Sequence, residues 1–253
     1  MSMSWPVAGP ALRKLTVTEA KLLWRTPAAL FWAVGFPLAG LLVLGLIPGT
    51  NKPVSSFGGA SVLQTYVPLV ITFSAVMTAV NFLPVTLVTY RERGILRRIS
   101  TTPVTPRAVL GAQLIVNISV QVVVAALTVG IAVAGFGFSV RSPLAFAVAF
   151  VLATAALNAL GLLVAAVCST GKAASAVGGL LFFVLMFLGG LWWPRPEMPG
   201  ALRHVSDVTP VGAAVQALQD GTAGHWAHPW YLAVLAGYVM ICGALATRFF
   251  RWE

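Results

Sequence analysis

Apolar residues run through this chain in six long stretches, separated by short breaks rich in Gly, Pro or charged residues. A helix that crosses a bilayer needs about 20 residues, because each adds about 1.5 Å toward a hydrocarbon core of about 30 Å. The pattern therefore predicts an all-α membrane protein of one domain, residues 1–253, with six transmembrane helices: 27–47, 61–89, 107–135, 143–167, 174–193 and 229–248. An even number of spans puts both termini on one side.

The distribution of charge orients these spans. Hydrophobic residues make up 58% of the chain and charged residues 9%, which is outside the usual range of soluble domains. A net charge of +10 would suggest nucleic-acid binding in a soluble protein. Twelve of the sixteen Lys and Arg residues fall on one side of the predicted topology, and the other four are Lys52, Arg141, Arg195 and Arg203. Because Lys and Arg resist translocation, we expect both termini in the cytoplasm and no nucleic-acid partner.

The segment before the first span lacks the continuous apolar core of a secretory signal, so we expect it to remain in the protein. Placed on a helical wheel, it separates leucines from basic residues: Leu12, Leu15, Leu22 and Leu23 against Lys14, Lys21 and Arg25. This pattern predicts an amphipathic helix that lies on membrane lipid at the inner interface. Glu19 falls within the apolar arc, and "TVTE" (16–19) could instead be a capping box that starts a new helix at Val17.

The break after the second span, "YRERGILRRISTTPVTPRAVLG" (90–111), holds five arginines. Helical placement of residues 91–99 puts Ile95, Leu96 and Ile99 on one side and arginines around the rest. The second span is longer than a bilayer requires, so its helix is expected to carry this loop into the cytoplasm. Such a short amphipathic helix suits the groove of a protein partner, and a basic loop lying on anionic lipid is the alternative.

The break before the sixth span, 194–228, contains a shorter helix pattern. Thr209 is a candidate N-cap, Pro210 a first helical residue, and Gly221 a stop. The helix is too short to cross, so it is predicted to be an external interfacial or re-entrant helix. The nearby histidines are expected to be interfacial or solvated, because a metal site needs a third ligand that the sequence does not identify: His204, His225 and His228. Cys168 and Cys242 are expected to be buried apolar residues.

The spans carry no Asp, Glu, Lys or Arg away from their ends. Ion-coupled carriers and intramembrane enzymes usually need such groups near the membrane centre, so both classes are disfavoured. The uncharged polar residues of the spans are expected to bond between helices or, alternatively, to contact substrate: Gln64, Asn81, Asn117, Gln121 and Asn158. A substrate path along the second span would include Gln64, Phe73, Met77 and Asn81.

A possible phosphate loop in "AAVCSTGKAAS" (165–175) does not meet the requirements of that motif. Ala166 stands where a Gly is needed for the backbone to wrap phosphate, and Ala173 where a Ser or Thr would bind magnesium. We therefore expect no ATPase activity of this chain and no catalytic residues.

Three stretches together resemble the membrane permeases of type-2 ABC exporters, which export drugs, lipids or polysaccharides. They are "YRERGILRRISTTPVTPRAVLGAQL" (90–114), "RTPAALFWAVGFPL" (25–38) and "GGLWWPRPEMPGALRHVSDVTPVGAAVQALQDG" (189–221). The resemblance implies a transport subunit that binds no cofactor itself, with ATP and Mg on a separate ATPase subunit. It also implies a second permease, either the same chain (homodimer) or a related one (heterodimer).

In this family the loop after span two is a coupling helix that contacts the ATPase. The residues that match the motif are Glu92, Arg93, Gly94, Leu96, Thr102 and Pro103, and the other predicted contacts are Ile95, Arg97, Arg98 and Ile99. The implied function is ATP-driven export of a hydrophobic drug, lipid or glycan-type substrate across the cell membrane. An ion-coupled secondary transporter is the alternative, and the substrate remains open.

Overall fold

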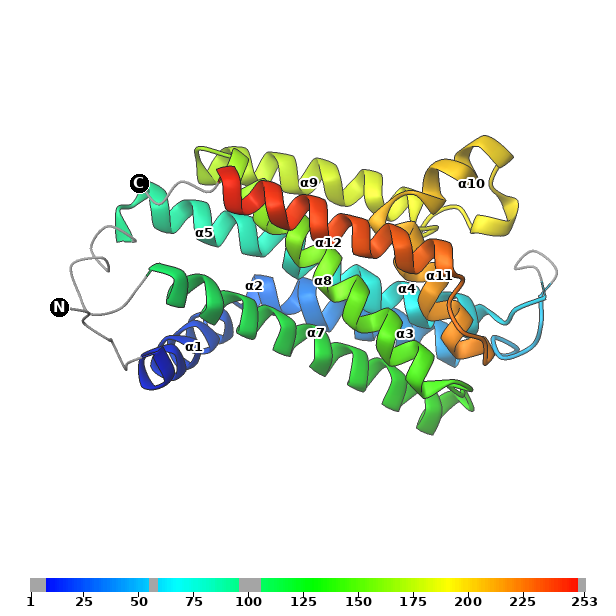
Figure 1. The fold of residues 1–253 in the computed structure, drawn as a ribbon. Helices are drawn as coiled ribbons and strands as arrows, with labels where there is room; N and C mark the ends of the chain where they lie inside the picture. The colour runs from blue at the N-terminus through cyan, green and yellow to red at the C-terminus, as the bar shows by residue number, and fades with distance from the viewer. Residues whose placement is uncertain (1–7, 55–58, 96–105, 250–253) are drawn as a thin grey trace.

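The computed structural model describes residues 8–54, 59–95 and 106–249, which form helices, turns and one isolated bridge between Pro53 and Ser61. The predicted ATPase contacts from Leu96 to Pro103 lie outside this part of the chain. Figure 1 shows a bundle of long helices with shorter ones at its two ends. In chain order the elements are α1 (Ala8–Trp24), α2 (Pro27–Leu30), η1 (Phe31–Gly35), α3 (Phe36–Leu46), α4 (Val62–Val76), η3 (Met77–Phe82), α5 (Leu83–Glu92), α7 (Pro106–Phe136), α8 (Pro143–Val167), α9 (Gly171–Leu188), η4 (Arg195–Glu197), α10 (Gly200–Asp207), α11 (Pro210–Ala223) and α12 (Pro229–Phe249).

Six helical stretches of the described chain are long and apolar enough to cross a membrane, which confirms the predicted number of spans. The second is longer than predicted, because α4, η3 and α5 run without a break to Glu92. The fifth begins earlier and ends earlier than predicted, at Gly171 and Leu188. Thr170 starts it by accepting a hydrogen bond from the Ala173 N–H, and a turn at Gly189 and Gly190 ends it.

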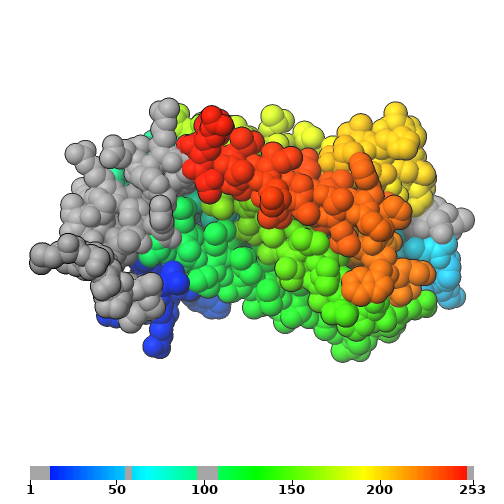
Figure 2. Space-filling view, in the orientation of Figure 1, coloured from blue at the N-terminus to red at the C-terminus, as the bar shows by residue number. Residues whose placement is uncertain are grey.

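The two ends of the bundle differ in charge. One end, which we call the basic end, holds α1, the end of α5, the start of α7, the α8–α9 turn and the end of α12 (Figure 1). The opposite end holds η4, α10 and the α11–α12 turn. Figure 2 shows α12 along one face of the molecule, beside the surfaces of α7 and α8. The described members of the two predicted sets of basic residues therefore lie at opposite ends of the bundle.

Two spans are interrupted by a π-helical segment just before a proline. Pro37 follows η1 and Pro84 follows η3. Proline lacks an N–H, so Pro37 cannot donate to the Ala33 carbonyl as an α-helical residue would. The buried Ser74 hydroxyl donates to that carbonyl at 2.6 Å instead. The second span thus donates a hydrogen bond to the first span at a carbonyl that lacks its usual partner within the helix.

A polar network at the centre of the bundle joins η3, α7 and α8. The Asn117 side chain donates to Asn158 at 3.0 Å, and the Asn158 side chain donates to Gln121 at 3.2 Å. Gln121 donates in turn to the Thr78 hydroxyl at 2.8 Å. All four side chains are buried and uncharged. The prediction of hydrogen bonds between helices is confirmed for Asn117, Gln121 and Asn158.

The helix before the sixth span differs from its predicted length. Thr209 caps the start of α11 by accepting from the Gly212 N–H at 3.1 Å, and Pro210 is its first residue, as predicted. The predicted stop at Gly221 is wrong, because α11 continues to Ala223 and ends at Gly224, which has a φ of 97°. Gly221 instead faces α8, where a Cβ would lie 2.8 Å from the Cα of Phe146. α11 is largely buried and packs against α4, α8 and α12.

Candidate functional site

The end of α5 is bonded to three other elements at the basic end. We call the consecutive residues Tyr90, Arg91 and Glu92 the α5 anchor. Successive residues of a helix point about 100° apart, so the three side chains reach different neighbours. The anchor therefore connects the second span to α1, to the end of α8 and to the start of α9.

Tyr90 bonds to α1 through a buried carboxylate. Its hydroxyl donates to both oxygens of Glu19, at 2.9 and 3.1 Å, and Gln113 of α7 donates to one of them at 2.6 Å. Glu19 is only 7% exposed. Burial raises the pKa of the Glu19 carboxyl above its ordinary value, although the two hydrogen bonds partly offset this. The carboxylate thus lies between α1, α5 and α7.

This placement explains why Glu19 falls within the apolar arc of α1. The capping-box alternative is wrong, because α1 continues without a break from Ala8 to Trp24 and the Thr16 hydroxyl donates to the Leu12 carbonyl. Leu12, Leu15 and Leu23 are half-buried on the side that faces α7, whereas Leu22 is exposed. The basic residues of the opposite side are exposed: Lys14, Lys21 and Arg25. α1 is therefore amphipathic, and its inward face includes one acidic group.

Arg91 and Glu92 hold the α8–α9 turn from both sides. The Arg91 guanidinium donates to the carbonyls of Ala165 and Cys168, at the end of α8. The Glu92 carboxylate accepts from the N–H of Gly171, the first residue of α9, at 3.0 Å. A cation at a helix C-terminus and an anion at an N-terminus both complement the helix dipole and satisfy free backbone groups. The Gly171 N–H, which belongs to the stretch that partly resembles a phosphate loop, is thus bonded to Glu92.

The predicted single helix over 91–99 is wrong at its start. α5 ends at Glu92, and the turn at Arg93 and Gly94, with a φ of 66° at Gly94, separates it from the helical Ile95. Arg93 is exposed beside this turn. The other predicted ATPase contacts lie outside the described residues: Leu96, Arg97, Arg98, Ile99, Thr102 and Pro103. Among the described predicted contacts, the two charged residues Glu92 and Arg93 are both exposed, and the Glu92 carboxylate bonds to Gly171.

A cavity of about 670 Å³ lies beside the anchor, and we call it the α1–α7 cavity. Its walls come from α1, α2, η1, η3, α5 and α7, with Ser175 of α9 at one edge. The lining is mainly apolar, with Trp32 and Phe82 among its aromatic residues. The polar lining includes Glu19, Asn81 and Asn117. This volume falls within the range of pockets that hold drug-sized molecules.

The residues of the predicted substrate path lie in different surroundings. Asn81 lines the α1–α7 cavity and donates to the Met77 sulfur at 3.7 Å. Phe73 is buried between Phe36 and Phe182, with ring centroids 5.3 and 5.2 Å away. Gln64 accepts from the Ser61 N–H as part of a capping box at the start of α4. The four residues are therefore not brought together in one cavity.

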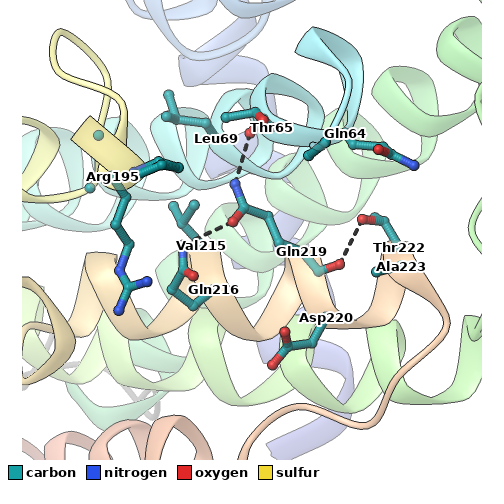
Figure 3. A pocket seen from close by; sticks show the side chains of 14 residues that line it. Gln64, Thr65, Leu69, Arg195, Val215, Gln216, Gln219, Asp220, Thr222 and Ala223 are labelled. Carbon is teal, nitrogen blue, oxygen red and sulfur yellow. Dashed lines mark hydrogen bonds between the residues drawn. The ribbon is translucent and has the colours of Figure 1, made fainter. Parts of the chain in front are cut away.

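A smaller pocket of about 180 Å³ lies at the opposite end, between α4 and α11 (Figure 3). Gln219 donates across it to the Thr65 carbonyl at 3.2 Å and accepts from Gln216 at 2.9 Å. Arg195, another lining residue, pairs with Asp207. Gln64 also lines this pocket, and the hydrogen bond from Gln219 to Thr65 joins two of its lining residues.

The histidines near this end take part in local contacts. The backbone N–H groups of His225 and His228 donate to the carbonyl and carboxylate of Asp220, respectively. His204 is exposed on α10. Across the described residues, no three His, Cys, Asp or Glu side chains are grouped to hold a metal ion. Cys168 and Cys242 are free and buried, as predicted.

Comparison with known proteins identifies the class of this six-span fold. Residues 10–222 match the family model of the ABC-2 type transporter, so the chain belongs to that family. It is similar to the daunorubicin resistance ABC transporter permease protein DrrB1 of Streptomyces coeruleorubidus, with 28% identity over 96% of this chain and 90% of that protein. With its six membrane-length helices, the chain is a multi-pass protein of the cell membrane and a type-2 ABC exporter permease.

Proposed function

We propose that this chain works with a separate ABC ATPase subunit to export a hydrophobic drug from the cytoplasm. The single observation that carries this proposal is the α5 anchor, which joins the loop after span two to three other elements of the bundle. The drug-resistance permease that resembles the chain over nearly its whole length supports a drug as substrate.

The basic end is the proposed ATPase-facing, cytoplasmic end. The predicted coupling residues begin at Glu92, the last residue of α5, and Arg93 is exposed at the turn that follows. The positive-inside rule supports this orientation, because most of the Lys and Arg residues that the structure describes belong to this end. In this orientation α1 lies at the inner membrane interface. The proposed transporter also contains an ATPase subunit, which binds ATP and Mg, and a second permease.

The anchor provides a mechanical route from the loop to the spans. A displacement of the loop would move the end of α5. Because α5 is hydrogen-bonded to Glu19 of α1 and, through Arg91 and Glu92, to the α8–α9 turn, these elements would move with it. Elements bonded in this way move together as a rigid body, which is a common form of conformational switching. ATP-driven closure of the ATPase would thus shift several spans at once and open a path for substrate.

Co-purification from mild detergent tests the proposal. The ATPase should co-purify with the wild-type chain and be lost or strongly reduced with Leu96→Asp or Arg93→Glu. The control is Lys52→Glu, which makes a matched charge change at an exposed residue of the opposite end. If both loop variants retain the ATPase at the wild-type level, the loop is not the contact. Transport that needs an ion gradient and no ATPase would favour a secondary transporter instead.

A further inference from the structure

The Glu19 carboxylate is buried without a positive partner. Its two hydrogen-bond donors, Tyr90 and Gln113, are neutral. Within the part of the chain that the structure describes, no Lys, Arg or His side chain lies within ion-pair distance of the Glu19 carboxylate. The ion pair of the described residues joins Arg195 to Asp207, at the opposite end of the bundle. A buried charge is costly unless it is paired, so a bound cation would lower the free energy of this site.

The same carboxylate lines the α1–α7 cavity. Trp32 and Phe82 give the cavity aromatic walls, and Leu22 and Leu23 add aliphatic surface from α1. Aromatic faces attract organic cations as well as apolar groups. Arg25 also lines the cavity, but it is exposed, so water and salt screen its charge.

We propose that the α1–α7 cavity binds an organic cation with an apolar body, whose positive group is held by Glu19. The body of the ligand lies along Trp32 and Phe82, and Tyr90 and Gln113 are positioning residues that fix the carboxylate at the cavity wall. The inference rests on the proposed export function, because it assigns the cavity as the place where substrate is loaded. It narrows the substrate class from hydrophobic compounds to amphipathic cations.

A purely structural role for Glu19, in which it only attaches α1 to α5 and α7, makes a different prediction. Glu19→Gln keeps a side-chain oxygen that can accept from Tyr90 and Gln113, so an attachment role would leave ligand affinity unchanged. A cation site would lose affinity, because the substitution removes the charge. The charge and the hydrogen bonds of Glu19 can therefore be tested separately.

The experiment measures binding of tetraphenylphosphonium to the purified full-length chain in a neutral detergent, by calorimetric titration. Tetraphenylborate, an anion of almost the same size and shape, serves as the matched probe. We expect Glu19→Gln to weaken tetraphenylphosphonium binding by at least about tenfold and not to weaken tetraphenylborate binding. Comparing variant with wild type for each probe cancels the different partition of the two ions into detergent.

Two further variants support the measurement. Glu197→Gln removes an exposed carboxylate at the opposite end and should leave the affinity for both probes unchanged. Trp32→Ala truncates a wall residue that is 43% exposed, so it should fold even if Glu19→Gln does not. We expect it to weaken tetraphenylphosphonium binding about threefold to tenfold. Wild-type affinity for tetraphenylphosphonium in either Glu19→Gln or Trp32→Ala would overturn the proposal.

Failure of this inference is distinguishable from failure of the proposed function. Cation binding is measured on the permease alone, whereas the export function is tested by ATPase co-purification. If the ATPase co-purifies and Glu19→Gln binds the cation normally, only the cation site is wrong. If the cation site behaves as expected but no ATPase co-purifies, the proposed function together with a separate ATPase subunit is wrong.

Discussion

The hydroxyl of Tyr90 donates to both carboxylate oxygens of Glu19, residues that are 71 positions apart in the chain. This contact fixes α1 to the end of the second span, so the position of α1 does not depend on lipid alone. Gln113 bonds to the same carboxylate and brings α7 into the contact. A movement of α5 would therefore displace α1 relative to the surrounding membrane.

Replacing Arg91 should destabilise the protein more than replacing its neighbour Arg93. Arg91→Ala leaves the carbonyls of Ala165 and Cys168 without their donor, whereas Arg93 is exposed. We expect a loss of about 1–3 kcal/mol for Arg91→Ala and a loss within about 0.5 kcal/mol for Arg93→Ala. Thermal unfolding in detergent, followed by tryptophan fluorescence, measures both. Equal effects of the two changes would show that Arg91 does not hold the α8–α9 turn.

Adjacent glycines of α9 should differ in their tolerance of a methyl group. A Cβ at Gly178 would lie 2.7 Å from the Val80 carbonyl oxygen, while one at Gly179 would meet nothing within 4 Å. We expect Gly178→Ala to cost about 1–3 kcal/mol through overpacking. Gly179→Ala should be neutral or slightly stabilising, because Ala favours helix over Gly. The comparison requires only unfolding temperatures, and a stable Gly178→Ala variant would contradict the close packing of α9 on η3.

The central network should show energetic coupling between Asn117 and Asn158. A double-mutant cycle with Asn117→Ala and Asn158→Ala should give a coupling energy of about 0.6 kcal/mol, with about 1.7 kcal/mol as an upper bound. Ser119, exposed on the same helix with its hydroxyl donating to the Ile115 carbonyl, provides the control cycle with Asn158. Its coupling should be zero within error. Additive effects of Asn117 and Asn158 would mean that their hydrogen bond contributes nothing to stability.

Glu19 should make the stability of the protein depend on pH. Burial raises the pKa of its carboxyl in the folded state above the ordinary value of 4.5. A raised pKa stabilises the folded state at low pH, and this contribution is lost as pH rises from 4.5 through the folded-state value. Glu19→Gln remains neutral, so its unfolding temperature relative to wild type should increase across that range and then level off.

This prediction is measured by thermal unfolding of both proteins between about pH 4 and about pH 8. Glu197→Gln is the control, since its exposed carboxylate should give no such trend. A difference between Glu19→Gln and wild type that is constant or decreases with pH would contradict it.

The sequence was sufficient for the six spans, because membrane-length apolar helices depend on composition more than on particular contacts. It was also sufficient for the start of α11, where Thr209 and Pro210 are local signals. The end of α11 was missed because "QDGTAGH" contains two glycines and only packing against Phe146 tells them apart. Local sequence patterns thus predicted which helices form more accurately than they predicted where each helix ends.

The partners of the anchor could not be predicted from local patterns. Glu19 falls within the apolar arc of the helical wheel, and its partners Tyr90 and Gln113 lie 71 and 94 positions away in the sequence. Glu92 was predicted to contact the ATPase by family resemblance, yet its carboxylate bonds to Gly171 within this chain. The sequence signal for a buried contact was the acidic Glu19 at a position of the helical wheel where the pattern requires an apolar residue.

The π-helical turn of η3 sets the direction in which the basic end of the second span faces. Such a turn contains one residue more than an α-helical turn, and each residue rotates a helix by about 100°. Deleting one residue within Met77–Phe82 would leave the span long and apolar but turn the α5 anchor by about 100°, away from Glu19 and the α8–α9 turn. The direction in which the α5 anchor faces around the helix axis thus depends on the number of residues in η3.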